Sequence, residues 1–244
     1  MPPLPKAILF DLDETIVSFA DRRETLITVG REFAEFLGPL TAEDIADVME
    51  SSYATLWSDP VSHKIWRFRM KDSRVHTSML AFEKLRDRAP LLTPELAQEF
   101  GERFHELREF DVTCFPGAIE TLDELRRRGI KLALITNGHS DTQRRKLDQF
   151  DLNRRFEHIQ IEGEVGFGKP EPQAYIHAME RLGVWAKDTW MVGDNLEWEV
   201  AAPQRLGIYS IWHDHRRTGL PPGSSVKPDR IVTNISELLE DGAH

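Results

Sequence analysis

The chain has 244 residues, of which 40% are hydrophobic and 30% charged, and its formal net charge is −10. This composition is typical of a globular protein with one large domain, or with a core domain and a smaller one. The acidic balance argues against binding of a nucleic-acid polymer, because such binding needs a positive face that releases counterions.

The single cysteine, Cys114, excludes an intrachain disulfide and is consistent with a reducing compartment. The N-terminal segment carries no long apolar region followed by a cleavage site, and no apolar run approaches the roughly 20 residues that a membrane span needs. We therefore expect a cytoplasmic protein that is neither secreted nor bound to a membrane.

The first predicted element is a buried strand over residues 7–10, which reads AILF and ends directly before Asp11. Asp11 and Asp13 lie two residues apart, so on extended backbone their side chains point to the same side. Two carboxylates that close repel each other unless one binds a proton, both share a cation, or water screens them at the strand end.

The region from about residue 18 to residue 114 shows no convincing strand pattern. Its amphipathic segments predict helices over residues 24–38, 42–57, 78–88 and 94–110. The sequence therefore predicts a helical domain over residues 18–114, inserted into a core domain formed by residues 1–17 and 115–244.

The second half of the chain alternates short apolar runs with helical patterns. Strands are predicted within residues 131–138, 158–164, 189–195, 209–214 and 230–235, and helices over residues 117–129 and 172–183. Strands that alternate with helices indicate right-handed crossovers, so we expect an α/β, Rossmann-like core with a parallel sheet.

Four short polar stretches follow predicted strands of this core. They are Asp11-x-Asp13, Thr136-Asn137-Gly138, Gly168-Lys169-Pro170 and Gly193-Asp194. In an open parallel sheet the carboxyl ends of the strands form the edge where ligands bind. The stretches would bring carboxylates, a hydroxyl and an ammonium group to that edge.

The four stretches DLDET, ITNG, GKPEP and VGDN, in this order, resemble the four motifs of the haloacid dehalogenase superfamily of phosphohydrolases. The helical insertion is similar to the cap domain that one group of this family carries between its first and second motifs. The return into the core, FPGAIETLDELRRRGIKLALITNG, also resembles that group. In the insertion itself the resemblance is only architectural.

The resemblance implies a Mg²⁺-dependent phosphatase that acts on a small phosphorylated metabolite. Asp11 would be the nucleophile that forms an aspartyl-phosphate. Asp13 would act as general acid and then as general base. Asp11, the backbone carbonyl of Asp13, and Asp194 would bind Mg²⁺, which prefers oxygen ligands and bridges to phosphate.

The second and third motifs would bind the phosphoryl group. Thr136 and the backbone amide of Asn137 would hold phosphate oxygens, and Lys169 would neutralise both the nucleophile and the transferring group. In the fourth motif the family usually has a second Asp five residues after the first, where this chain has Glu199. Either Glu199 or Glu197 could support a metal-bound water.

Other functions fit the same motifs to different degrees. A phosphoglucomutase-like phosphotransferase would use both aspartates, and a non-catalytic phosphate-binding module would also cluster carboxylates, a Thr and a Lys at a sheet edge. A haloacid dehalogenase would need neither Asp13 nor Asp194. A phosphonatase would need a lysine in the cap, for which Lys64 or Lys71 is a candidate.

Two further patterns are open to more than one interpretation. The basic segment 63–74 in the predicted cap could bind an anionic leaving group, or its cations could simply be solvated. His213 and His215 could chelate a metal, although a surface loop is the simpler interpretation. The sequence does not choose between sugar phosphates, phosphoglycolate and nucleoside monophosphates as substrates, and it does not indicate an oligomeric state.

Overall fold

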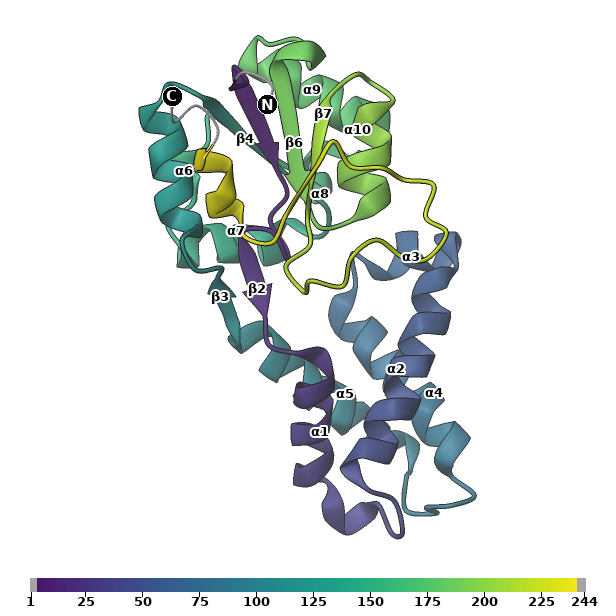
Figure 1. Ribbon diagram of the computed structural model, residues 1–244. Coiled ribbons are helices and arrows are strands. Elements are labelled where there is room, and N and C mark those ends of the chain that lie inside the picture. Colours follow the sequence, from purple (N-terminus) through teal and green to yellow (C-terminus); the bar gives the residue numbers. More distant parts are fainter. Residues whose placement is uncertain (1–3, 241–244) are drawn as a thin grey trace. The chain divides into compact units, whose positions relative to one another are not determined.

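The computed structural model describes residues 4–240, apart from the side chains of Pro60 and His63, and divides into two compact units (Figure 1). The core unit comprises residues 1–18 and 113–244, and the helical unit comprises residues 19–112. Residues 1–3 and 241–244, which the predicted core domain includes, lie outside the described residues.

The core unit is built on a six-stranded sheet with the order β5-β4-β1-β6-β7-β8. Its strands are β1 (Ala7–Phe10), β4 (Lys131–Thr136), β5 (His158–Ile161), β6 (Thr189–Gly193), β7 (Tyr209–His213) and β8 (Arg230–Val232). All five pairings between neighbours are parallel, so the predicted Rossmann-like α/β core is confirmed. The strand order turns at β1: the chain continues first to β4 and β5, and then returns to β6 on the other side.

Helices cover both faces of this sheet, with α6 on one side and α9 and α10 on the other (Figure 1). The core helices are α6 (Ala118–Arg127), α7 (Ser140–Gln149), α8 (Glu162–Val165), α9 (Pro172–Leu182), α10 (Ala202–Gln204) and a π-helix at Leu196–Ala201. Ala7 and Leu9 of β1 are buried in the same apolar cluster as Tyr175 and Ala178 of α9. Alternate residues of the strand therefore face this helix.

Two short strands, β2 (Val17–Phe19) and β3 (Val112–Cys114), form a separate pair where the chain leaves and re-enters the core unit. The expectation that residues 18–114 contain no strand is therefore wrong at both ends. Three residues are too few to show an alternating pattern, and these strands form a two-stranded sheet of their own, with one isolated bridge from Val17 to Asp13. Backbone contacts continue the pairing, because the Phe115 amide donates to the Ile16 carbonyl at 3.0 Å.

The helical unit contains α1 (Arg22–Glu32), α2 (Ala42–Ser58), α3 (Pro60–Trp66), α4 (Met70–Leu85) and α5 (Pro94–Phe110). Local sequence fixes several helix starts. Thr41 and Asp44 form a capping box at α2, and Thr93 caps α5 with Pro94 in its first turn. The apolar faces of the helices meet in one buried cluster that includes Phe82, Phe100 and Phe104.

Candidate active site

The predicted site residues lie at the carboxyl ends of four adjacent strands of the core unit. Asp11 follows β1, Thr136 ends β4, and Asp194 follows β6. Lys169 lies in the loop after β5 and the short helix α8. Because the sheet order is β5-β4-β1-β6, these four strand ends are neighbours, and the motifs converge on one part of the sheet edge.

Asp11 and Lys169 form a buried ion pair at the centre of this edge. The Lys169 Nζ lies 2.5 Å from Asp11 Oδ1, and the Thr15 hydroxyl donates to Asp11 Oδ2 at 3.2 Å. Lys169 Nζ also lies 2.7 Å from Glu199 Oε1. The lysine is therefore shared by two carboxylates, one directly after β1 and the other in the π-helix that follows β6.

The electrostatics of this cluster reflect burial and an excess of carboxylates. Burial raises the pKa of Asp11. Lys169 lowers this pKa and Asp13 raises it, and the net result is a raised pKa. Burial raises the pKa of Glu199 to about 7. Burial and the carboxylates of Glu199 and Asp11 raise the pKa of Asp194 well above its usual value. Burial would lower the pKa of Lys169, but Asp11 and Glu199 outweigh it and raise that pKa.

The two glutamates of the fourth motif occupy different environments. Glu199 is buried and accepts from the Asn195 amide at 2.9 Å as well as from Lys169. Its side chain passes over Gly193, where an added Cβ would lie only 2.0 Å from Glu199 Cγ, so only glycine fits there. Glu197 is exposed and pairs with Arg205 at 2.6 Å. Of the two, only Glu199 lies beside the Asp11–Lys169 pair.

Asn137 holds the loop that carries Lys169. Its side-chain amide donates to the Lys169 carbonyl at 2.7 Å, and its Oδ1 accepts from the Lys169 amide at 2.9 Å. Gly168 permits this approach, because a Cβ there would lie 2.6 Å from Asn137 Oδ1. The sequence predicted a role for the backbone amide of Asn137. The structure adds a positioning role for its side chain.

Two site residues, Gln143 and Lys146, were not predicted from the sequence. Both are buried on α7, and both contact Asp13: Lys146 Nζ lies 2.7 Å from Oδ1, and Gln143 Nε2 donates to Oδ2 at 3.0 Å. Gln143 also donates to the Thr136 hydroxyl. The segment 140–149 is strongly polar, so neither residue stood out from its neighbours. Their only signal is the three-residue spacing that places them on one helix face.

The chemistry of the donor set fits a divalent cation. Asp11, Glu199 and Asp194 face one ammonium group, that of Lys169, so a site with all three ionised carries two excess negative charges. Within residues 4–240, no group of three or more His, Cys, Asp or Glu side chains is spaced to hold a metal ion. A site formed by Asp11, Asp194 and the Asp13 carbonyl, which uses two side chains and a backbone oxygen, is compatible with that finding.

The pair His213 and His215 does not form a surface loop. His213 ends β7 and is buried, and Phe115 packs edge-on against both rings, with centroids 5.0 and 5.1 Å away. His213 Nδ1 lies 3.1 Å from the carbonyl oxygen of Glu14, which has a positive φ of 59°. The histidines therefore pack beside the turn that follows Asp13 and help to hold its backbone.

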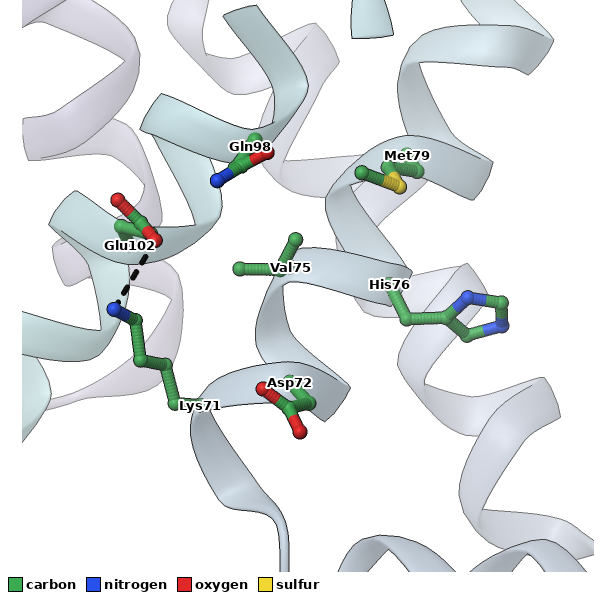
Figure 2. Close-up of a pocket in the computed structure, with 7 residues that line it drawn as sticks. All are labelled: Lys71, Asp72, Val75, His76, Met79, Gln98 and Glu102. Carbon is green, nitrogen blue, oxygen red and sulfur yellow. Dashed lines mark ion pairs between the residues drawn. The ribbon is translucent and has the colours of Figure 1, made fainter. Parts of the chain in front are cut away.

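The basic segment 63–74 uses much of its charge within the helical unit. Arg69 pairs with Asp72 at 2.8 Å, Lys71 with Glu102 at 3.0 Å, and the buried Arg74 with Glu109 at 3.3 Å. Figure 2 shows the Lys71–Glu102 pair beside a pocket of about 370 Å³. This pocket is lined by Lys71, Asp72, Val75, His76, Met79, Gln98 and Glu102. It includes Lys71, the candidate phosphonatase lysine, but none of the residues of the four motifs at the sheet edge.

The sheet, the ordered motifs and the clustered carboxylates define a hydrolase class, and comparison with known proteins agrees. The model of the haloacid dehalogenase-like hydrolases matches residues 5–207. The chain therefore belongs to the haloacid dehalogenase-like hydrolase family. None of the helices described here has the length and apolar character of a membrane span.

Several curated relatives are named phosphatases or nucleotidases. A phosphoserine phosphatase from Thermus thermophilus is 39% identical over 148 residues, which is 60% of this chain and 57% of that protein. The pyrimidine 5'-nucleotidase YjjG from Escherichia coli is 27% identical, with 95% of each chain aligned. The N-acylneuraminate-9-phosphatase from Rattus norvegicus is 28% identical over 96% of this chain and 92% of its own.

Solved structures share the whole architecture. The magnesium-bound HAD hydrolase YfnB from Bacillus subtilis has a TM-score of 0.69 at 20% identity, with 98% of both chains covered. A 2-haloacid dehalogenase from Pseudomonas syringae has a TM-score of 0.58 at 25% identity, with 97% of both chains covered. These similarities support the fold, with its inserted helices, over essentially the full length.

Proposed function

We propose that this hydrolase is a Mg²⁺-dependent phosphatase that cleaves a small phosphomonoester through an aspartyl-phosphate intermediate. The observation that carries the proposal is the Asp11 carboxylate, held by Lys169 at 2.5 Å where four strand ends meet, with Asp13 two residues further on. The names of relatives that align along most of the chain, a nucleotidase and a sugar-acid phosphatase, support the same reaction class.

In the first half of the proposed reaction an Asp11 oxygen attacks the phosphorus of the substrate. The bond between phosphorus and the leaving oxygen breaks as the bond to Asp11 forms, and Asp13 gives its proton to the leaving oxygen. Lys169 offsets the negative charge of both the nucleophile and the phosphoryl oxygens. The Thr136 hydroxyl and the Asn137 amide donate to those oxygens.

In the second half water attacks the phosphorus of the aspartyl-phosphate. Asp13, now ionised, accepts a proton from that water, and the bond between Asp11 and phosphorus breaks. Inorganic phosphate leaves, Asp11 returns to its carboxylate form, and Asp13 is protonated again for the next substrate. No other reactant is needed, because water supplies both the oxygen and the proton.

Asp11, the Asp13 carbonyl and Asp194 would hold Mg²⁺ in this proposal, with Glu199 beside them. When bound, the cation supplies positive charge that offsets the clustered carboxylates and the substrate phosphate. This assignment is supported by the carboxyl groups of Asp11, Asp194 and Glu199, which outnumber the single ammonium group of Lys169 that faces them.

The helical unit is proposed to act as a cap that selects the leaving group. The chain enters it at β2 and leaves it at β3, close to residues 18–19 and 115–117, where hinges are proposed. Closure of such a unit over the site would exclude bulk water and bring cap side chains to the substrate. The proposed cap extends over residues 18–114, as the sequence predicts.

The test is phosphate release from p-nitrophenyl phosphate, with Mg²⁺ and with EDTA, by the wild type and by Asp13→Asn. We expect metal-dependent release, and a loss of roughly 10²-fold or more in the turnover of the variant, because its amide cannot accept the proton of the water that attacks the aspartyl-phosphate. Release that persists in EDTA, or full activity in Asp13→Asn, would contradict the mechanism. A panel of phosphorylated metabolites would then identify the substrate.

Three alternatives would give different results in the same assay series. A phosphoglucomutase-like enzyme would convert a sugar 1-phosphate into its 6-phosphate, with little free phosphate. A phosphate-binding module would take up phosphate stably and release none. A dehalogenase would release halide from a 2-haloacid. It would keep this activity in Asp13→Asn, because its reaction needs no general acid at that position.

A further inference from the structure

Gln143 and Lys146 form a buried polar pair on α7 that the proposed reaction does not yet use. Gln143 is 2% exposed and Lys146 is 4% exposed. Buried lysine is costly because its ammonium group loses hydration, and a well-packed apolar side chain at the same place is often neutral or stabilising. The burial of these two polar side chains therefore points to a function at the site rather than to a gain in stability.

The side-chain amide of Gln143 has all its hydrogen-bonding groups in use. Its Nε2 donates to Asp13 Oδ2 at 3.0 Å and to the Thr136 hydroxyl, and its Oε1 accepts from Lys146 Nζ at 2.8 Å. An amide nitrogen has two hydrogens, so one serves each acceptor. Gln143 therefore links the end of β4 to the carboxylate that follows β1.

The neighbours of Gln143 allow only one orientation of its amide. If the amide were flipped, its oxygen would face the Asp13 carboxylate, and its NH₂ group would face the Lys146 ammonium. Both contacts would be repulsive, acceptor against acceptor and donor against donor. Lys146 thus fixes the orientation of Gln143, and it also contacts Asp13 directly, at 2.7 Å from Oδ1.

This orientation determines where the Thr136 hydroxyl can donate. Because its oxygen accepts from Gln143, its own hydrogen must point elsewhere. The protein acceptor that it has is the Asn137 carbonyl oxygen at 3.5 Å, which is a long contact. A phosphate oxygen would be a better acceptor, so Gln143 leaves the hydroxyl hydrogen available for substrate.

We propose that Gln143 and Lys146 are positioning residues that aim two site groups at once: the Asp13 carboxylate as acid and base, and the Thr136 hydroxyl as phosphate donor. This inference rests on the proposed phosphatase function and deepens it. The two residues act through Asp13 and Thr136, and neither needs to touch the substrate. Proton transfer to the leaving group is the step that depends on them most.

The test compares kcat/KM for p-nitrophenyl phosphate and for an alkyl monoester, glycerol 2-phosphate, in Lys146→Met and Gln143→Glu. The aryl group leaves without a proton, whereas the alkyl group needs one from Asp13. In Lys146→Met we expect a loss of about 10²-fold for the alkyl ester and only a few-fold for the aryl ester. In Gln143→Glu the misdirected Thr136 hydroxyl should add a loss common to both esters, and the alkyl ester should still lose more. Lys146→Arg, which keeps a donor for Asp13, should recover much of the loss.

The matched control is Gln149→Glu, which makes the same chemical change at an exposed position of the same helix. It should leave both substrates unaffected. Equal losses for aryl and alkyl esters in Lys146→Met and Gln143→Glu, or no loss, would overturn the inference while the phosphatase function stands. A general folding defect would produce equal losses, and thermal melting of each variant would detect it.

The absence of any phosphatase activity in the wild type would instead refute the proposed function. Crystal structures of the wild type and of the same two variants would then decide the inference by themselves. We expect the Asp13 carboxylate to leave its position in Lys146→Met and the Thr136 hydroxyl to turn toward residue 143 in Gln143→Glu. An unchanged Asp13 and Thr136 in both variants would rule out a positioning role.

Discussion

The core unit and the helical unit place their charged residues differently. In the core unit, Lys169 and Lys146 are buried and contact carboxylates more than 130 residues away in the chain, Asp11 and Asp13. In the helical unit most ion pairs are solvent-exposed, as in Lys71–Glu102, where the side chains are 53% and 38% exposed. Among the described residues of that unit, Arg74 and Glu109 form a pair that is largely buried.

This difference shows where each unit derives its stability and where chemistry is built. Burial of ammonium and carboxylate groups seldom gains stability, whereas aromatic packing of the kind seen around Phe100 does. The rings of Phe33 and Phe82 lie 5.3 and 5.4 Å from that of Phe100. Substitutions of buried ions in the core unit should therefore affect activity, and also stability where they leave a buried charge without its partner. Substitutions of buried rings in the helical unit should affect stability.

The largest effect is expected from Asp11→Asn. The amide cannot attack phosphorus, so phosphate release should fall by roughly 10⁴-fold or more. The variant also removes one of the two carboxylates that contact Lys169. Glu199 still pairs with the lysine, so we expect no large loss of stability. Activity assays together with thermal melting check both expectations, and full activity in a folded Asp11→Asn protein would exclude Asp11 as the nucleophile.

Lys169→Met is expected to reduce both activity and stability. It leaves the Asp11 and Glu199 carboxylates buried without their ammonium group, at 2.5 and 2.7 Å respectively in the wild type. We expect losses of about 10²- to 10³-fold in kcat and of about 3–5 kcal/mol in the free energy of unfolding.

Two controls bracket the Lys169 result. Glu199→Gln changes a carboxylate of the same cluster instead of the lysine. It removes an excess negative charge and keeps an acceptor for the backbone amide of Asn195. In urea unfolding, Glu199→Gln should lose less free energy of unfolding than Lys169→Met. Lys71→Met breaks an exposed pair and should change stability by less than about 0.5 kcal/mol. Equal losses in Lys71→Met and Lys169→Met would contradict the distinction between the two units.

Phe100→Ala should destabilise the helical unit by about 3–5 kcal/mol, because it leaves a cavity between the rings that pack on it. Phe100 is fully buried, whereas Phe110 on the same helix is 83% exposed. Phe110→Ala is therefore the matched control and should change stability little. Differential scanning calorimetry measures both. An unchanged melting profile in Phe100→Ala would mean that this aromatic cluster does not stabilise the unit.

Much of the core could be predicted because its signals are local. Apolar runs of four to six residues mark β1, β4 and β6, and the polar residues that follow them mark the sheet edge. The parallel sheet brings those edges together whatever the details of packing. For this reason the sequence could predict that Asp11 and Thr136 lie at one sheet edge, which Lys169 reaches through its contact with Asp11.

Other site features depend on long-range packing and could not be predicted. Gln143 and Lys146 lie in a polar helix whose buried face is defined only by its contact with Asp13. The pairing of Glu199 with Lys169 requires the side chain to cross Gly193, which no pattern along the chain reveals. Residues that act through another residue leave a weaker trace in sequence than those placed at strand ends.

A modest pH dependence is expected from His215 of the core unit. Burial, with His213 and Arg216 nearby, lowers the pKa of His215 to about 4, against an ordinary value of 6.5. A histidine whose pKa is lower in the folded state stabilises the fold above its unfolded pKa, and this contribution disappears as the pH falls from about 6.5 toward 4. The contribution of His215 to the free energy of unfolding should therefore decline between pH 7 and pH 5, whereas the buried carboxyls of Glu199 and Asp194, whose pKa values are raised, contribute in the opposite direction.

In urea unfolding, His215→Asn should remove this decline of about 1 kcal/mol, a value reduced for the solvent that screens this half-buried ring. At pH 8, where the imidazole is neutral in both states, the comparison of variant and wild type measures only the change in packing against Phe115. Parallel pH curves for the two proteins would show that His215 does not carry the dependence. The neighbouring His213, whose pKa burial also lowers, would then be the residue to replace.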